Sequence, residues 1–165
     1  MIGMGMLRGS PKGRPTNILQ QEESAMTTTA NSTIIEIAND LVAHCKIEAS
    51  DFVEHDAKIW DKHFAEGWTS IEGDGKTYTG RDEVAAKYKE WQAGVIVHGC
   101  EVSGPFVGSD GFSVIFDLDM ESKDGSWPRT KMQEVANYTV ENGKIVKEEF
   151  RYPPMSCDGE CGCEK

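Results

Sequence analysis

The sequence predicts an α+β fold in which three N-terminal helices pack in the concave face of a strongly curved antiparallel sheet, giving a cone-like α+β barrel. Three observations predict it. Apolar residues recur mainly at helical spacing up to Gly94. From Val95 onward the apolar period falls to two residues. The turns between these later segments are too short for the crossover that parallel strands need. We therefore expect a pocket of small-molecule size between the helices and the sheet.

The first helix is expected to begin at Thr33, because Thr33-Ile34-Ile35-Glu36 has the T-x-x-E pattern of a capping box. Residues 1–32 are rich in Gly, Pro, Ser and Thr and predict a disordered N-terminal arm, in which Met26 is a candidate alternative translation start. Residues 33–153 are expected to form one folded domain. The apolar stripe of the first helix consists of Ile34, Ile37, Ala38, Leu41, Cys45 and Ala49.

Two more helices and a short hairpin are expected before Gly94. The second helix runs from about residue 51 to 64. The hairpin pairs residues 68–72 with residues 76–79 across a Gly-Asp-Gly turn. The third helix covers residues 80–94 and has an apolar face made of Val84, Tyr88 and Trp91.

Four β-strands are expected after the third helix. The strongest turn signal is Asn142-Gly143, because both central positions of a type I′ turn need a positive φ. Turns this short join antiparallel neighbours, so the strands are expected to meander. The four strands are runs of β-branched and aromatic residues: Val95–Phe106, Phe112–Ser122, Arg129–Glu141 and Lys144–Tyr152.

Alternation along these strands predicts which side chains face the helices. In the second run the inner set is wholly apolar: Phe112, Val114, Phe116, Leu118 and Met120. In the third run the inner set joins Glu134 to Met132, Ala136, Tyr138 and Val140. In the fourth it joins Glu148 to Val146, Phe150 and Tyr152. The first run is less decisive, and its more apolar phase places His98 inward.

The candidate catalytic residues are Glu134, Glu148 and His98. An isolated carboxylate is very costly to bury, so it persists where water, a partner or a ligand meets it. Desolvation raises its pKa toward neutrality, and a neighbouring imidazole can exchange the proton in general acid–base catalysis. The candidate pocket-lining residues are aromatic or imidazole side chains: Trp60, His63, Trp68, Trp91, Phe116, Tyr138, Phe150 and Tyr152.

A structural alternative stays open for each of these residues. The two glutamates can reach solvent at the open end of the sheet, or be satisfied by His98 or tyrosine hydroxyls without chemistry. His63 lies near a helix end, where a histidine commonly interacts with the helix dipole. Trp60 and Trp91 can equally belong to an ordinary core.

The acidic composition excludes several classes of partner. The chain has 165 residues, with 17 Lys and Arg against 28 Asp and Glu, and a formal charge of −11. Such a field repels phosphate backbones and anionic lipids, so neither nucleic acid nor membrane is expected as a partner. Because no apolar run has the length of a membrane span or the form of a secretory signal, we expect a cytoplasmic protein. We expect no cofactor.

The C-terminal residues 154–165 are expected to form a flexible Cys-rich tail. The thiols of Cys157, Cys161 and Cys163 have C-x3-C-x-C spacing, which can hold a soft metal ion or take part in thiol exchange. The spacing lacks the C-x2-C knuckles of stable zinc sites, and the acidic neighbours raise thiol pKa values. We therefore expect no metal site here.

The order helix, helix, hairpin, helix and four strands resembles the nuclear transport factor 2-like superfamily, and in particular its SnoaL-like polyketide cyclase branch. Three stretches carry the resemblance: Glu72-Gly73-Asp74-Gly75 leading to Gly80-Arg81-Asp82-Glu83-Val84, the run Gly99–Phe106, and MQEVANYTVENGKIVKEEFRY from Met132 to Tyr152. The resemblance covers residues 34–153. It implies a cone with a deep apolar pocket, commonly a homodimer through the convex sheet face.

The resemblance also implies an activity class without fixing the reaction. We expect a small-molecule-binding protein, an acid–base enzyme such as an isomerase, cyclase or hydrolase acting on a small, largely apolar substrate. The alternative is a non-catalytic ligand-binding or dimerisation module. The sequence departs from the site patterns of its relatives, because Asp117, Asp119 and Arg151 fall in the outward phase and Arg129 lies near a turn. Only the location of the pocket is therefore carried over.

Overall fold

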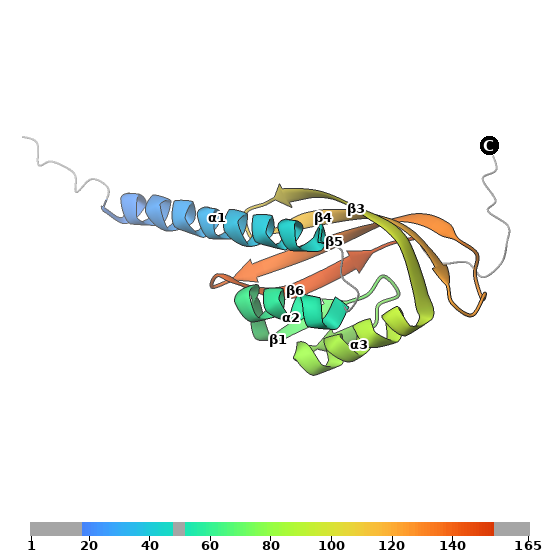
Figure 1. The fold of residues 1–165 in the computed structure, drawn as a ribbon. Helices are drawn as coiled ribbons and strands as arrows, with labels where there is room; N and C mark the ends of the chain where they lie inside the picture. The colour runs from blue at the N-terminus through green and yellow to red at the C-terminus, as the bar shows by residue number, and fades with distance from the viewer. Residues whose placement is uncertain (1–17, 48–51, 154–165) are drawn as a thin grey trace, which may run out of the picture.

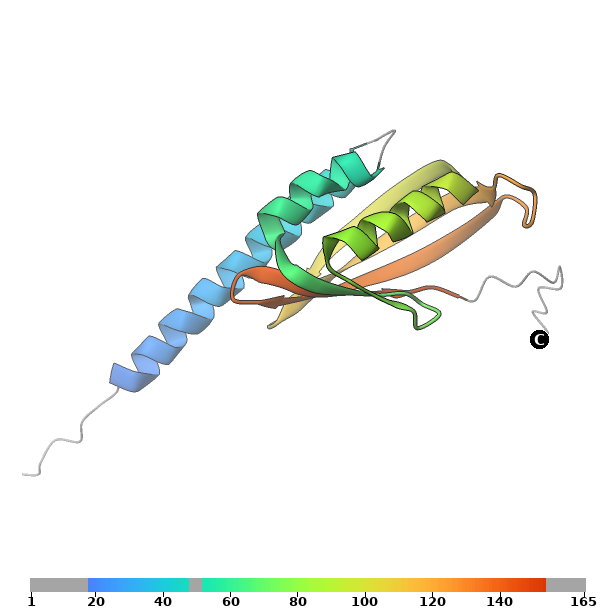
Figure 2. The same cartoon turned by 90° about the horizontal axis from the view of Figure 1, so that it is seen from below.

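The computed structural model describes residues 18–47 and 52–153. Three helices lie on one face of a six-stranded sheet, so the predicted α+β class is confirmed (Figures 1 and 2). The elements follow in the order α1 (Ile18–Cys45), α2 (Phe52–His63), β1 (Phe64–Ile71), β2 (Thr77–Thr79), α3 (Gly80–Gly94), β3 (Val95–Val107), β4 (Gly111–Ser122), β5 (Thr130–Glu141) and β6 (Lys144–Arg151).

The sheet is mixed and open, which corrects the prediction of an antiparallel one. Its strand order is β2-β1-β6-β5-β4-β3. The strands β3, β4, β5 and β6 form the expected antiparallel meander, but β1 pairs with β6 in parallel. Since α3 and four other strands separate β1 from β6 in the chain, the connection is long enough for a parallel pair.

Helix α1 begins earlier than predicted. It starts at Ile18 rather than Thr33, so the expected disordered arm is helical from Ile18 onward. The segment between them contains neither Gly nor Pro and opens with the helix-favouring run Leu19-Gln20-Gln21-Glu22-Glu23. In Figures 1 and 2 this part of α1 projects beyond the sheet. Residues 1–17 and the Cys-rich tail 154–165 lie outside the described residues.

The core lies between the helices and the inner face of the sheet. Each layer contributes a side chain with at most 2% exposure: Ile37 from α1, Val84 from α3, Val114 from β4 and Ile145 from β6. Burying one such aliphatic side chain stabilises the fold by about 1.5 to 3 kcal/mol. The helices are thereby held against the sheet, and polar side chains on the same inner face are kept from water.

Alternation locates the inner face of β4, β5 and most of β6 correctly. The turn before β6 has positive φ at Asn142 (50°) and Gly143 (75°), as predicted. The register then shifts between Thr139 and Val140, and this irregularity reverses the phase locally. Ile145, predicted to face outward, is consequently fully buried. No helix in the described part of the chain is long and apolar enough to cross a membrane.

Candidate acid–base site on the inner face of the sheet

The register of the strands brings three polar side chains into one row. Ser70 on β1 pairs with Glu148 on β6, and Glu148 pairs in turn with Tyr138 on β5. All three are buried, with exposed fractions of 0%, 2% and 6%. Both predicted glutamates lie on the inner face, because no register shift falls between either of them and the buried Tyr138 or Phe150.

Helix α3 adds a lysine that the sequence analysis did not single out. The Lys87 ammonium donates to Ser70 Oγ at 2.9 Å and to Glu72 Oε1 at 2.6 Å. It also lies 4.2 Å from the ring centroid of Tyr88 and 4.7 Å from that of Phe150. The side chains of Lys87 and Glu72 are only 10% and 19% exposed, so this is an interior ion pair.

Glu148 is the most enclosed carboxyl group of the cluster. Burial raises its pKa above the ordinary value, while the positive charge of Lys87 and the nearby Ser70 and Trp68 oppose that rise. Its Oε1 atom nevertheless has no hydrogen-bond partner of good geometry, and neither has the indole Nε1 of Trp68, although the indole lies near enough to the carboxyl group to lower its pKa. Unpaired buried donors and acceptors are rare because each costs about 1 to 3 kcal/mol. Together they suit a polar atom of a bound molecule.

Glu134 lies farther along the sheet and has a different environment. Burial, reinforced by the negative charge of Glu72, raises the pKa of Glu134 to about 7, with Lys87 acting in the opposite direction. Its neighbour across β4 is Phe116. A carboxyl group with this pKa is half ionised at neutral pH, so it can accept a proton and return it.

The two glutamates are not in one hydrogen-bonded pair. The register places Glu148 opposite Tyr138, four residues along β5 from Glu134, an offset of roughly 13 Å at strand spacing. Glu72 is near both of them, because its negative charge raises the pKa of each, and its second oxygen accepts a hydrogen bond of 3.1 Å from the Tyr152 hydroxyl. The two carboxyl groups can therefore meet different parts of one molecule.

His98 is not part of this cluster, and its predicted inward position was wrong. A β-bulge between Val97 and Gly99 reverses the alternation at His98. The residue is exposed, and its Nε2 atom lies 3.1 Å from Glu121 on the outer side of β4. The imidazole therefore cannot share a proton with Glu134 or Glu148.

The predicted aromatic lining residues lie in the core near the cluster. Trp68 is 2% exposed and packs against Trp60 and Phe64, with ring centroids 5.6 and 5.1 Å apart. Trp60 also stacks on Tyr88 at 6.0 Å. Tyr138 and Phe150 lie on the inner face and are each 6% exposed, whereas Tyr152 and Phe116 are half-buried.

Two predicted lining residues have other contacts. The buried His63 places Nε2 at 2.9 Å from Asp40 on α1, so it ties α2 to α1. Trp91 packs edge-on against Phe52 at 5.7 Å, between α3 and the start of α2. Both contacts join helices to one another. The structural alternative for His63 is thereby the better description.

The charged residues that were expected to face away from the helices lie on the outer face of the sheet. The Arg129 guanidinium donates to both Asp119 oxygens, at 2.7 and 2.8 Å, on the outer face. Asp117 accepts a hydrogen bond of 2.9 Å from Gln133, and Arg151 pairs with Glu149. These groups satisfy one another outside the cone, and none of them supplies the inner cluster.

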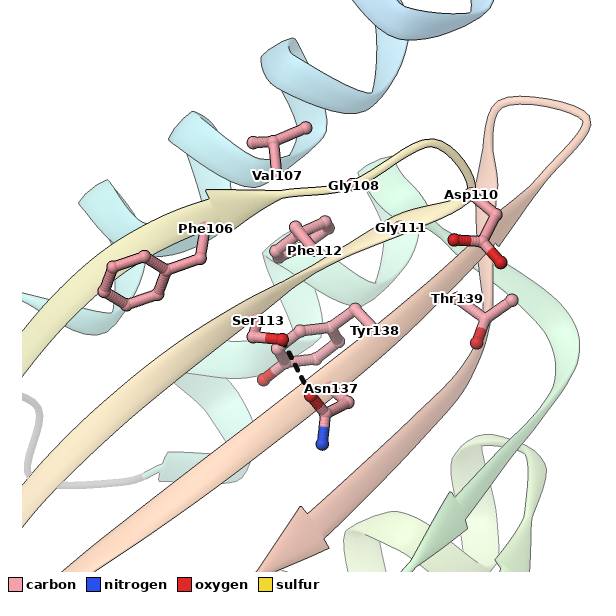
Figure 3. Close-up of a pocket in the computed structure, with 10 residues that line it drawn as sticks. All are labelled: Phe106, Val107, Gly108, Asp110, Gly111, Phe112, Ser113, Asn137, Tyr138 and Thr139. Atoms are coloured by element: carbon pink, nitrogen blue, oxygen red, sulfur yellow. Dashed lines mark hydrogen bonds between the residues drawn. The ribbon is translucent and has the colours of Figure 1, made fainter.

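The outer face carries a shallow groove of about 580 Å³ between β3, β4 and β5. Figure 3 shows Phe106 at one edge, with Ser113 and Asn137 joined by a hydrogen bond of 2.7 Å. Of the predicted site residues only Tyr138 borders it, and its ring stacks on Phe112 toward the core at 4.8 Å. The groove and the acid–base cluster are therefore on opposite faces of the sheet.

The comparisons with known proteins agree with this fold. Residues 32–152 match the family described as SnoaL-like domain. A protein from Mesorhizobium loti, named both as a SnoaL-like polyketide cyclase and as a carbohydrate phosphatase, is 34% identical, with a TM-score of 0.62, and the match covers 72% of this chain and 98% of that chain.

A second solved structure shares the fold alone. PhzB2, a phenazine biosynthesis-related protein from Pseudomonas aeruginosa, is 13% identical with a TM-score of 0.55, over 78% of this chain and 84% of that one. No curated protein matches the sequence. The family match over most of the folded region makes this chain a member of the SnoaL-like domain family, within the nuclear transport factor 2-like superfamily.

Proposed function

We propose that this protein is an acid–base enzyme that isomerises or cyclises a small, largely apolar substrate carrying a carbonyl group. One observation carries the proposal: Glu148 Oε1 and Trp68 Nε1 are buried in the core, each without a hydrogen-bond partner of good geometry, although the indole lies near enough to the carboxyl group to lower its pKa. A protonated carboxyl and an indole N–H are both donors, and a carbonyl oxygen accepts two hydrogen bonds. The aromatic surroundings of the pair suit an apolar carbon skeleton.

Glu134 supplies the base in this proposal. It takes a proton from the carbon next to the carbonyl, and the electron pair moves onto the oxygen, where Trp68 and protonated Glu148 stabilise the negative charge. Return of the proton at another carbon gives an isomer. Attack of the carbanion on a second carbonyl carbon of the same molecule gives a ring, and the alkoxide formed there takes the proton that Glu134 holds. Because the backbone positions of the two glutamates are offset by roughly 13 Å along the sheet, their side chains must lean toward each other to reach one carbonyl group and its neighbouring carbon.

Lys87 has a supporting role in the proposal. Its ion pair with Glu72 and its hydrogen bond to Ser70 leave it as a fixed positive charge beside both glutamates. That charge lowers the pKa of Glu134 and so keeps part of this carboxyl ionised at neutral pH. The likeness to the Mesorhizobium loti protein named as a polyketide cyclase supports chemistry next to a carbonyl group.

Deuterium exchange tests the proposal without knowledge of the natural substrate. The bicyclic ketone 2-decalone is incubated with the protein in D₂O, and loss of the protons next to the carbonyl is followed by NMR. We expect catalysed exchange that falls by about 10² to 10⁴-fold in Glu134→Gln, the usual size of a general-base contribution. Glu101→Gln, an exposed outer-strand glutamate, is the matched control and should exchange at the wild-type rate.

The binding-module alternative gives a different result in the same assay. Naphthol, whose hydroxyl imitates an enol oxygen, would bind and lose affinity in Glu148→Gln and Trp68→Phe, but decalone would show no catalysed exchange. Exchange that persists in both glutamate variants would overturn the acid–base proposal.

A further inference from the structure

We propose that His44, His55 and Asp56 form a binding site for a divalent transition-metal ion of the zinc type between the end of α1 and the start of α2. Each residue offers one ligand atom, and these atoms all lie within 4.8 Å of one another. The site uses none of the residues assigned to proton transfer, and no spacing pattern in the sequence predicted it.

The geometry is close to that of a metal site. His44 Nε2 lies 3.0 Å from Asp56 Oδ1. In a tetrahedral zinc site with bonds of about 2.0 Å, neighbouring ligand atoms are roughly 3.3 Å apart. A cation can therefore take the position of the proton that His44 and Asp56 now share, and that proton passes to solvent.

His55 needs a small movement to complete the site. Its ring stacks on that of His44, with centroids 3.7 Å apart and planes at 17°. One hydrogen bond of 3.2 Å, between His55 Nε2 and the His44 carbonyl, holds this position. Rotation of the His55 side chain exchanges that single bond for a metal bond. Two imidazoles and one carboxylate then leave a coordination position for water.

The electrostatic surroundings favour a cation. Burial raises the pKa of Asp56, which means that nearby positive charge does not fully offset the desolvation of its ionised carboxylate. Burial lowers the pKa of His44 against the opposing effect of its hydrogen bond to Asp56, and this favours the neutral imidazole whose lone pair a metal needs. Imidazole suits zinc, cobalt, nickel and iron, whereas magnesium and calcium prefer all-oxygen sites.

Cobalt(II) is the probe that tests the site on the full chain. We expect one bound Co²⁺ per chain, seen as visible d–d absorption that added Zn²⁺ abolishes and Mg²⁺ does not. Asp56→Asn, His44→Gln and His55→Gln should each weaken binding by at least about 100-fold. His98→Gln is the matched control, because His98 is exposed on the outer face, and it should bind as the wild type does.

A second measurement separates this site from the C-terminal cysteines and from misfolded variants. In the wild type, Co²⁺ should shift the imidazole NMR signals of His44 and His55 and leave that of His98 in place. The triple variant Cys157→Ser, Cys161→Ser, Cys163→Ser should keep the visible spectrum. Loss of Co²⁺ binding in the triple variant, unshifted His44 and His55 signals, or no binding below millimolar Co²⁺ would each overturn the proposal.

Discussion

Lys87 and Glu72 form an ion pair inside the fold, with Nζ and Oε1 2.6 Å apart and side-chain exposures of 10% and 19%. The pair joins α3 to the end of β1 and adjoins both Glu134 and Glu148 electrostatically. A buried charge that loses its partner is strongly destabilising, because its desolvation is no longer compensated. The same pair therefore contributes to stability and to the proton affinity of the site.

Substitution of Lys87 tests this relationship. We expect Lys87→Met to lower the free energy of unfolding by about 3 kcal/mol, because Glu72 is left buried and unpaired. The double variant Lys87→Met, Glu72→Gln should recover part of that loss. Lys62→Met is the control at the exposed ion pair with Asp40 and should unfold almost as the wild type does. Urea unfolding measures all three, and equal stabilities for Lys87→Met and Lys62→Met would contradict the account.

Glu134 makes stability depend on pH. Its native pKa is about 7 against an ordinary value of 4.5, so the native state binds more protons than the unfolded chain between these values. The stabilisation is complete below pH 4.5 and is lost as the pH rises through 7. Its size is at most about 3 kcal/mol.

The free energy of unfolding of the wild type should therefore fall between pH 5 and pH 7, in urea titrations at each pH. In Glu134→Gln the free energy of unfolding should fall less steeply with pH. The fall that remains is expected from Glu148, whose pKa is also raised. Identical slopes for the wild type and the variant would show that Glu134 titrates as an ordinary surface carboxyl.

The inner-face glutamates could be predicted because simple alternation holds between Glu134 and Tyr138 and between Glu148 and Phe150. It failed at His98 and Ile145, where a bulge inserts or removes one residue from the pairing. A bulge depends on the partner strand, so a single strand's pattern does not reveal it.

Lys87 was missed for a different reason. It lies three residues after Val84 and one before Tyr88, so it borders the apolar face of α3, but long charged side chains there are usually exposed. Its burial depends on Ser70 and Glu72, which reach it because α3 packs against β1. That packing joins two elements separated by a hairpin turn, and no local pattern in either element predicts it. The signal that could have identified Lys87 is its position at the border of the apolar face of α3, the face expected to pack over the inner-face carboxylates.

Gly111 fixes the approach of β4 to β5. A Cβ atom at this position would lie 1.9 Å from the backbone oxygen of Tyr138, so any side chain forces the strands apart. We expect Gly111→Ala to destabilise the protein by about 3 kcal/mol, at the upper end of overpacking effects. At Gly67 a Cβ atom would have no neighbour within 4 Å, and Gly67→Ala should retain the wild-type melting temperature. Equal melting temperatures of the two variants would contradict the described register.

The outer groove bears on the expected homodimer. We propose that two copies associate through the convex sheet face, where Phe106 is 55% exposed beside Ser113 and Asn137. Native mass spectrometry should then give the mass of two chains. Asn137→Lys should weaken the dimer by at least about tenfold, or 1.4 kcal/mol, while Asp82→Lys on α3 should not. A single-chain mass at all concentrations, or dissociation only in the α3 variant, would exclude this interface.

The central claim is that two carboxyl groups lie on the inner face of the sheet, Glu148 fully buried and Glu134 half-buried, where desolvation raises the pKa of both. A ¹³C NMR titration of glutamate-labelled protein, with Glu134→Gln and Glu148→Gln assigning the signals, measures this directly. We expect the carboxyl carbon of Glu134 to titrate near pH 7 and that of Glu148 to titrate above its ordinary range. Titration of both near pH 4.5 would mean that they are solvated, and the acid–base site would not exist as described.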